Sequence, residues 1–169
     1  MNYFEEFDLI FSNATLHWVK DHRKLLSNCY EALKSGGYVR FNFADDGNCS
    51  NFYKVIKEVI SEEEYIQFFK NFERPWYMPD LKEYEDLLKG CEFKEISTWG
   101  ENTDRYFKNE DEMTGWIDQP SIVPFLKLVD ENKTTFRNEV VDRMVRVTIQ
   151  PDSSCFETFR RINVFAKKG

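Results

Sequence analysis

The sequence predicts an α/β fold, because strand, helix and strand patterns follow one another early in the chain. Residues 7–13 contain the continuous apolar block Leu9-Ile10-Phe11, which is typical of a strand buried on both faces. Residues 21–33 carry apolar side chains at one-face helical spacing, and Ser35-Gly36-Gly37 supplies a stop. Residues 38–43 then alternate apolar and polar side chains. Such a βαβ unit closes with parallel strands and a right-handed connection.

The remaining chain is predicted to be rich in helix. Asp80 and Glu83 resemble a capping box ahead of a helix that Gly90 ends. The other expected elements are helices over about 52–60, 65–72, 111–117, 122–129 and 130–149 and strands over 93–99 and 161–167. No internal repeat, linker or low-complexity tract interrupts the chain. We therefore expect residues 1–169 to form one compact α/β domain with a helical insertion.

The composition limits the classes of function. Hydrophobic residues make up 41% of the chain and the formal net charge is -7, which disfavours binding to nucleic acid. The four cysteines are scattered and there are only two histidines, so no clustered metal site is expected. The acidic amino terminus is unlike a signal peptide, and no apolar run approaches a membrane span. These features favour a cytoplasmic protein that does not bind membranes.

A resemblance to a known family begins in the first strand and its loop. The segment Phe7-Asp8-Leu9-Ile10-Phe11-Ser12-Asn13-Ala14-Thr15-Leu16-His17-Trp18-Val19 resembles strand four and the next loop of class I S-adenosylmethionine-dependent methyltransferases, especially the trans-aconitate methyltransferases. Leu33-Lys34-Ser35-Gly36-Gly37 resembles their turn into strand five. The likeness then continues in order through Trp76-Tyr77, Tyr84 with Leu87-Leu88, Trp116, Pro124-Phe125-Leu126 and Ile162-Asn163-Val164-Phe165-Ala166.

The resemblance implies a partial Rossmann-like methyltransferase sheet with strands four, five, seven and six, the last two antiparallel. A helical cap would come from residues of about 50–80 and 110–150. The family holds S-adenosylmethionine with a glycine-rich loop after strand one and an acidic residue after strand two. The resemblance starts at strand four, and the seven glycines form no such cluster, so neither feature is expected in this chain. The chain is therefore expected to be the carboxyl-terminal part of such an enzyme, without its amino-terminal cofactor-binding half.

The same resemblance assigns candidate site residues. The loop after strand four would lie beside the methyl donor, so the candidate cofactor-binding residues are Asn13, Ala14, Leu16 and His17. Candidates for the acceptor pocket are Trp18, Trp76, Tyr106 and Trp116, although ordinary packing is an alternative role for each. No catalytic residue is assigned, because a carboxylate acceptor is already ionised at neutral pH and needs no general base.

The acceptor is less well defined than the cofactor. The family usually has an arginine shortly before Pro-Phe-Leu, and this chain has Val123 there, which disfavours trans-aconitate itself. Arg74, Arg105 and Arg137 are alternative sources of a guanidinium for a carboxylate. An apolar acid is a further possibility, because the chain also resembles juvenile-hormone-acid methyltransferases.

Two hypotheses for the function remain open. The first is methyl transfer to a small organic acid by a larger or completed enzyme of which this chain is a part. The second is a catalytically inactive remnant that acts as an assembly or binding module. An apolar strand over 8–13 without a neighbour would expose a pairing edge. We expect a second copy of the chain, a separate amino-terminal fragment or the chain's own helices to cover it.

Overall fold

The computed structural model describes residues 3–119 and 121–169, which divide into two compact units. The first unit contains the chain up to Asn48, Pro75–Thr103 and Arg160–Gly169, and the second contains Cys49–Arg74 and Asp104–Phe159. The sequence predicts one domain with helical elements near 50–80 and 110–150. The two units are one built on a sheet and one that is mainly helical.

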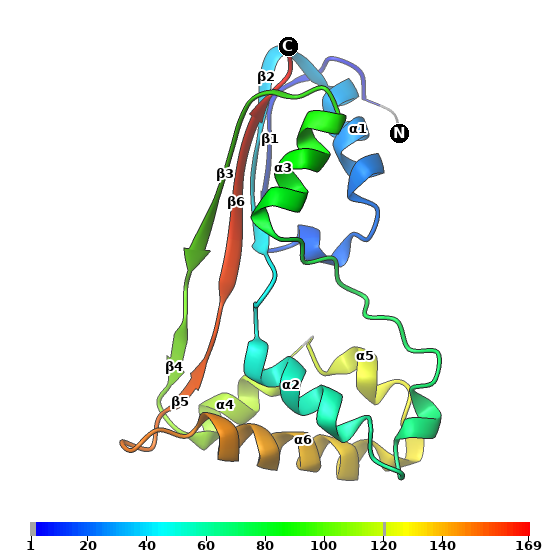
Figure 1. Cartoon of the computed structure of the whole chain (residues 1–169), viewed down its shortest axis with the longest axis vertical. Helices are drawn as coiled ribbons and strands as arrows, with labels where there is room; N and C mark the ends of the chain where they lie inside the picture. The colour runs from blue at the N-terminus through cyan, green and yellow to red at the C-terminus, as the bar shows by residue number, and fades with distance from the viewer. Residues whose placement is uncertain (1–2, 120) are drawn as a thin grey trace. The chain divides into compact units, whose positions relative to one another are not determined.

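The first unit contains a four-stranded sheet in the order β1-β2-β6-β3 (Figure 1). Its strands are β1 (Phe7–Asn13), β2 (Leu33–Ala44), β6 (Arg160–Lys167) and β3 (Lys94–Asn102). β1 runs parallel to β2, whereas β6 is antiparallel to both β2 and β3. This order confirms the expected arrangement of strands four, five, seven and six.

Helices α1 (His22–Ala32) and α3 (Leu81–Gly90) lie on the same side of this sheet (Figure 1). The alternation of β2 turns Val39, Phe41 and Phe43 toward them, and all three side chains are buried. They share a core with residues of the two helices and of β6, namely Leu26, Cys29, Tyr84, Leu88, Ile162, Val164 and Ala166. The predicted one-face burial of residues 38–43 is therefore confirmed.

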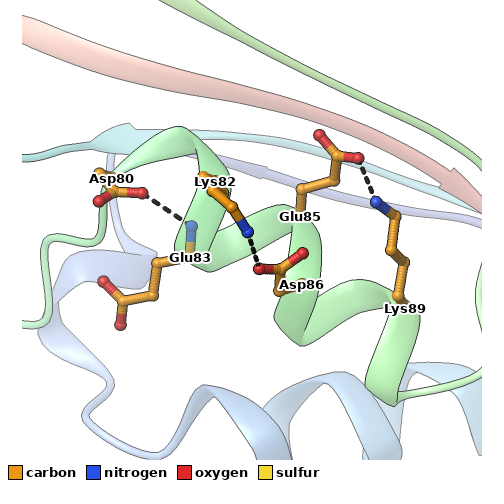
Figure 2. Close-up of polar contacts among 6 residues, drawn as sticks. All are labelled: Asp80, Lys82, Glu83, Glu85, Asp86 and Lys89. Carbon is orange, nitrogen blue, oxygen red and sulfur yellow. Dashed lines mark hydrogen bonds and ion pairs between the residues drawn. The ribbon is translucent and has the colours of Figure 1, made fainter.

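The start of α3 is fixed by a side-chain cap, as Figure 2 shows. Asp80 accepts a hydrogen bond from the backbone amide of Glu83 at 2.7 Å. The predicted capping box is only half formed, because the Glu83 carboxylate accepts from the Tyr77 hydroxyl at 2.7 Å instead. Along the exposed side, Lys82 pairs with Asp86 and Lys89 with Glu85, both in i,i+4 spacing. Solvent-exposed pairs of this kind stabilise a helix only weakly.

Strand β1 differs from the prediction of a strand buried on both faces. Leu9 is 45% exposed and Phe11 is 64% exposed, while Ile10 is only half-buried. β1 is an edge strand, and in the first unit the described helices lie on the other face of the sheet from Leu9 and Phe11. The prediction of double burial is therefore wrong for the described chain. An apolar edge of this kind is a surface to which another chain can pair.

A polar network occupies the face of the sheet opposite to α1 and α3. Asn163, on β6, accepts hydrogen bonds from Arg40 at 2.8 Å and from Asn42 at 3.0 Å. It donates in turn to the Glu101 carboxylate at 3.0 Å. The Arg40 guanidinium also lies over the Trp99 ring, 4.7 Å from its centroid. Partly buried polar side chains on this face are thus paired with one another.

The second unit is mainly helical and has an aromatic core. Its elements are α2 (Ser50–Val59), α4 (Glu110–Ile117), α5 (Val123–Leu126), α6 (Lys133–Thr148), the 3-10 turns η2 (Ile66–Phe68) and η3 (Asp130–Asn132), and the paired strands β4 (Arg105–Phe107) and β5 (Cys155–Glu157). The rings of Phe69 and Phe136 stack at 5.7 Å, and Tyr65 meets Phe136 edge-on at 5.1 Å.

Two predictions for this unit are wrong, and one pair of short strands was not predicted. Residues 65–72 form turns around η2 rather than a helix, because Tyr65 and Phe69 pack individually against α6. The helix expected over 122–129 is shortened to the four residues of α5. The short strands β4 and β5 were not expected, since three-residue segments give little alternation to detect.

Substitution of Gly37 by alanine is expected to destabilise the first unit. A Cβ at this position would lie 3.0 Å from the Lys34 carbonyl oxygen and 3.1 Å from that of Phe7. Both contacts are with backbone atoms, so the chain must shift, and a loss of about 1–3 kcal/mol follows. Gly115 is the matched control, because nothing lies within 4 Å of its Cβ position and it is inside α4. Gly115→Ala is expected to stabilise by about 0.5–1 kcal/mol. Urea unfolding measures both, and equal effects of the two variants would contradict the crowding argument.

Candidate functional site

The loop after β1 turns sharply at the carboxyl end of the sheet. Ala14 has a positive φ of 55°, and its amide donates to the Asn42 carbonyl at 2.7 Å. The Thr15 hydroxyl donates to the Asn13 carbonyl at 3.0 Å. The chain then forms η1 (Leu16–Trp18), in which the Leu16 side chain is buried. The loop is therefore held to the ends of both β1 and β2.

The His22 side chain holds this loop in place through hydrogen bonds. Its Nε2 lies 2.9 Å from the Leu16 carbonyl oxygen and its Nδ1 lies 3.0 Å from the Tyr84 hydroxyl. A carbonyl oxygen can only accept, so Nε2 carries the proton and Nδ1 accepts from Tyr84. Burial lowers the pKa of His22, which keeps the ring neutral as this arrangement requires. The Tyr77 ring packs against it at 4.6 Å.

A second loop follows β2. The amide of Asp45 donates to the Arg160 carbonyl at 3.2 Å, and Asn48 accepts from the Arg160 amide at 3.2 Å. Gly47 has a φ of 84°, which favours glycine and closes the turn. Asp45 is thereby placed at the carboxyl end of β2 with only 9% of its surface exposed.

The segment 76–80 joins the two loops. The Tyr77 amide donates to the His17 carbonyl at 2.9 Å, and the Asp46 amide donates to the Pro79 carbonyl at 3.2 Å. The rings of Trp18 and Trp76 meet edge-on at 5.4 Å. Three segments that are distant in the sequence therefore converge at the carboxyl ends of β1 and β2. Ligands bind at this edge in open α/β sheets.

Two polar atoms at the carboxyl ends of β1 and β2 are buried without a hydrogen-bond partner. Among the described residues, the buried side-chain atoms that lack a hydrogen bond are Nδ1 of His17 and Oδ1 of Asp45. Native structures leave few such atoms, so each calls for an explanation. Burial lowers the pKa of His17 to about 4, with a smaller contribution from Arg161. Burial raises the pKa of Asp45 to about 6, although Arg160 and Arg161 oppose the shift.

A cavity of about 510 Å³ opens beside these loops in the first unit. It is lined by Phe11, Asn13, Ala14, Arg40, Asn42, Glu101, Thr103, Arg161 and Asn163. Its volume is within the range of small-molecule sites. The lining combines two arginines with three asparagines, which suits a small polar ligand.

The structure places the predicted site residues in both units. Asn13, Ala14, Leu16 and His17 lie in the loop after β1, and Trp18 and Trp76 lie together beside it. Tyr106 and Trp116 belong to the second unit. Tyr106 is 64% exposed and contacts Phe156, whereas Trp116 is buried against Phe107. Roles in binding for all eight residues stay predictions.

The three alternative arginines also lie in the second unit. Arg137 is engaged by Asp118 through two hydrogen bonds of 2.8 and 2.6 Å. Arg105 lies over the Phe107 ring and Arg74 lies over the Tyr53 ring. Val123 is the first residue of α5. Pro120, three residues earlier, lies outside the described residues.

Sequence reasoning missed Asp45, Arg161 and the anchoring role of His22. Asp45 directly follows an alternating strand, and the rule that ligands bind at strand carboxyl ends marks such a position. Arg161 carried no comparable signal, because it reaches the site only through the pairing of β6 with β2.

We expect His17 to stay neutral throughout the physiological range. Its pKa of about 4 means that the folded protein resists protonation below the ordinary value of 6.5. Stability should therefore fall as the pH decreases from 6.5 toward 4, because the unfolded chain takes up the proton first. Long-range ¹H–¹⁵N spectra of the two imidazoles measure this, with a His17→Gln variant to assign the signals. A His17 ring that titrates near 6.5 would contradict the burial of its Nδ1.

The described residues include no group of three or more His, Cys, Asp and Glu side chains placed to hold a metal ion. In the same residues, no helix is both long and apolar enough to cross a membrane.

Several known proteins are similar to this chain. Residues 3–41 match a family model described as a methyltransferase domain. The trans-aconitate 2-methyltransferase of Mycolicibacterium gilvum is 25% identical over 166 residues, which cover 95% of this chain and 64% of that protein. The malonyl-[acyl-carrier protein] O-methyltransferase of Calditerrivibrio nitroreducens is 32% identical over 75 residues, 43% of this chain and 31% of that protein.

The fold has solved counterparts as well. The structure of loganic acid methyltransferase with SAH superposes with a TM-score of 0.70 at 8% identity, covering 99% of this chain and 63% of that one. At this identity the likeness concerns the fold alone. The chain spans 64% of the length of the Mycolicibacterium gilvum relative.

Proposed function

We propose that this chain, a relative of the class I S-adenosylmethionine-dependent methyltransferases in sequence and fold, forms part of an enzyme that methylates a small organic acid. The observation that carries the proposal is the convergence of three segments at the carboxyl ends of β1 and β2, beside a cavity of about 510 Å³. The unpartnered acceptors of His17 and Asp45 at this edge support a ligand site.

Two relatives support an acid as the methyl acceptor. One is named for trans-aconitate and the other for malonyl-[acyl-carrier protein], and both of these compounds contain carboxyl groups. Trans-aconitate itself is not proposed, because Val123 replaces the arginine that the family pattern places there. An ionised carboxylate attacks the methyl group without loss of a proton, so the protein must chiefly orient it and exclude water.

The residues after β1 fit one side of S-adenosylmethionine. The loop from Asn13 to His17 would present backbone carbonyl oxygens, and such acceptors suit a positively charged sulfonium. When bound, the cofactor supplies an electrophilic methyl group. Trp18 and Trp76 would shield this side of the site from water. The chain has no glycine-rich cluster for the remainder of the cofactor.

We further propose that another polypeptide completes the site at the exposed edge of β1. Leu9 and Phe11 expose apolar surface there, and a cavity lined by Tyr3, Phe7, Leu9, Phe11 and Leu25, among others, follows the same edge. An amino-terminal methyltransferase fragment is the occupant that we propose, because residues 7–19 resemble strand four and the next loop of the family. A second copy of the chain is the alternative, and sedimentation of the purified chain at high concentration distinguishes the two.

Calorimetric titration of S-adenosylhomocysteine tests the proposed function. The chain is titrated alone and after mixing with the amino-terminal part of a trans-aconitate methyltransferase. We expect binding in the mixture and weaker binding to the chain alone. Transfer of labelled methyl from S-adenosylmethionine to a panel of small carboxylic acids should follow in the mixture.

The outcomes separate the hypotheses. Absence of cofactor binding in both samples, together with no methylated product, would contradict the proposed function. Tight association with the added fragment but no transfer to any acid would favour the binding-module alternative. A matched His17→Gln variant should weaken binding or transfer without altering association at the β1 edge.

A further inference from the structure

Three polar groups in the first unit lack the partners that their chemistry requires. Oδ1 of Asp45 and Nδ1 of His17 are buried polar atoms without a hydrogen-bond partner among the described residues. The guanidinium of Arg161 makes no hydrogen bond or ion pair with another side chain of the described part of the chain. Its strand neighbour in register on β3, Glu101, accepts from Asn163 instead.

These groups lie at one end of the sheet, where β1 and β2 have their carboxyl ends. Arg161 pairs in register with Ala44, the residue before Asp45. His17 and Asp46 are both tied to the segment 77–79 by backbone hydrogen bonds of 2.9 and 3.2 Å. Arg161 also lines the 510 Å³ cavity, together with Asn13 and Ala14 of the loop that carries His17. Arg161 therefore lines the cavity, and the backbone hydrogen bonds place His17 and Asp45 in the loops at the same end of β1 and β2.

We propose that Asp45, His17 and Arg161 bind the methyl acceptor, and that this acceptor carries a hydroxyl or amino group close to a carboxylate. The inference rests on the proposed function and narrows its substrate class. Arg161 would pair with a carboxylate, for which the guanidinium geometry is well suited. Asp45 and His17 would accept hydrogen bonds from the hydroxyl or amino group.

The charge states at neutral pH agree with these roles. Asp45 faces Asp46, Arg160 and Arg161, and its pKa of about 6 leaves it mainly ionised above pH 7. His17 faces Arg161 and His22, and its pKa of about 4 leaves it neutral. The Asp45 carboxylate is therefore an acceptor, and the neutral His17 ring accepts through Nδ1 when its proton is on Nε2. A ligand that supplies a donor removes the penalty of burying them unpaired.

Selectivity between matched acids is the measurable consequence. A site that hydrogen-bonds a ligand hydroxyl discriminates strongly against an analogue without it, because its buried groups are then left unpaired. Malate and aspartate differ from succinate by one hydroxyl and one amino group, so they serve as probes. We expect at least one of them to bind the 169-residue chain about 10-fold or more tightly than succinate. Comparison of the two identifies which donor the site prefers.

Variants assign the effect to the three residues. Asp45→Ala and His17→Phe should each reduce the preference over succinate toward unity. Arg161→Gln should weaken the binding of all three acids together. Asp46→Ala is the matched control, because Asp46 is the exposed neighbour of Asp45 in the same turn and should leave the preference unchanged. Calorimetry gives the affinities, and imidazole nitrogen shifts of His17 report contact directly.

Equal affinity for the three acids, or a preference that survives both Asp45→Ala and His17→Phe, would overturn the inference. Cofactor binding and methyl transfer would be unaffected by that result, so the proposed function could still stand. The opposite result is also informative. If the preference for malate or aspartate over succinate depends on Asp45 but no methyl transfer is detected, the acid site is supported and the proposed reaction is contradicted.

Discussion

Replacement of Glu157 by alanine is expected to destabilise the second unit by about 3 kcal/mol. The side chain is 0% exposed and accepts hydrogen bonds from the amides of Asn51, Phe52 and Thr158 at 3.2, 2.9 and 2.7 Å. Two of these amides belong to the first turn of α2, where a carboxylate is also favoured by the helix dipole. Alanine would leave the buried Phe52 amide and the partly buried amides of Asn51 and Thr158 without this acceptor.

Urea unfolding and hydrogen exchange of the α2 amides measure this effect. Glu58→Ala is the matched control, because Glu58 is an exposed glutamate on the same helix. Glu157→Gln keeps one acceptor oxygen and should lose less than the alanine variant. A loss for Glu157→Ala no larger than that for Glu58→Ala would contradict the role of Glu157 in holding α2.

The same residue gives a pH dependence with a defined sign. Burial raises the pKa of Glu157 above its ordinary value of 4.5, and the backbone donors only partly oppose this. The folded protein therefore binds the proton more readily than the unfolded chain. The contribution of Glu157 to stability is largest below pH 4.5 and is lost as the pH rises through the folded-state pKa. Glu157→Gln should remove this part of the pH profile.

Replacement of His22 by leucine is expected to destabilise the first unit by about 2–4 kcal/mol. His22 is buried and joins the Leu16 carbonyl to the Tyr84 hydroxyl. Leucine removes the partner of the Tyr84 hydroxyl and one of the two donors to the Leu16 carbonyl, which keeps only the Val19 amide. It also loosens the η1 turn that carries His17 and Trp18. We expect the exchange protection of residues 14–19 to fall more than that of β2.

Tyr84→Phe provides the matched comparison, because it removes only the hydroxyl that donates to Nδ1. Its expected loss is about 1 kcal/mol, and the double variant should lose less than the sum of the single ones. Because the pKa of His22 is lowered in the folded protein, the unfolded chain takes up the proton first. The free energy of unfolding should therefore fall as the pH decreases below 6.5. Additive losses in the double variant would contradict the His22–Tyr84 contact.

Local patterns predicted the strands and helices whose burial is one-sided. The alternation through Val39, Phe41 and Phe43 and the spacing of Leu26 and Cys29 reproduce the faces buried in the first unit. Residues 65–72 have equally apolar content, but their aromatic side chains pack separately onto α6, and tertiary contacts override helix propensity. The block Leu9-Ile10-Phe11 predicts burial, and the described chain provides no layer to bury Leu9 and Phe11.

The site was predictable only where it is continuous in the sequence. Asn13 to Trp18 form one stretch, and the resemblance to methyltransferases identifies that stretch directly. Asp45 and Arg161 are far apart along the chain. They come near one another because the strand register places Ala44, the residue before Asp45, opposite Arg161. The spacing of apolar residues does not predict which residues of two strands pair, so the proximity of Asp45 and Arg161 is seen only in the structure. The unpaired state of the Asp45 and His17 atoms likewise depends on packing from several segments.

The strand order has a consequence for folding during synthesis. β6 is made after β1, β2 and β3, yet it lies between β2 and β3 and hydrogen-bonds to both. Until residues 160–167 leave the ribosome, β2 and β3 have no common neighbour and the sheet cannot close. Such non-local pairing slows folding and leaves apolar strands exposed for longer. Nascent chains of this protein should therefore keep these strands exposed until residues 160–167 emerge.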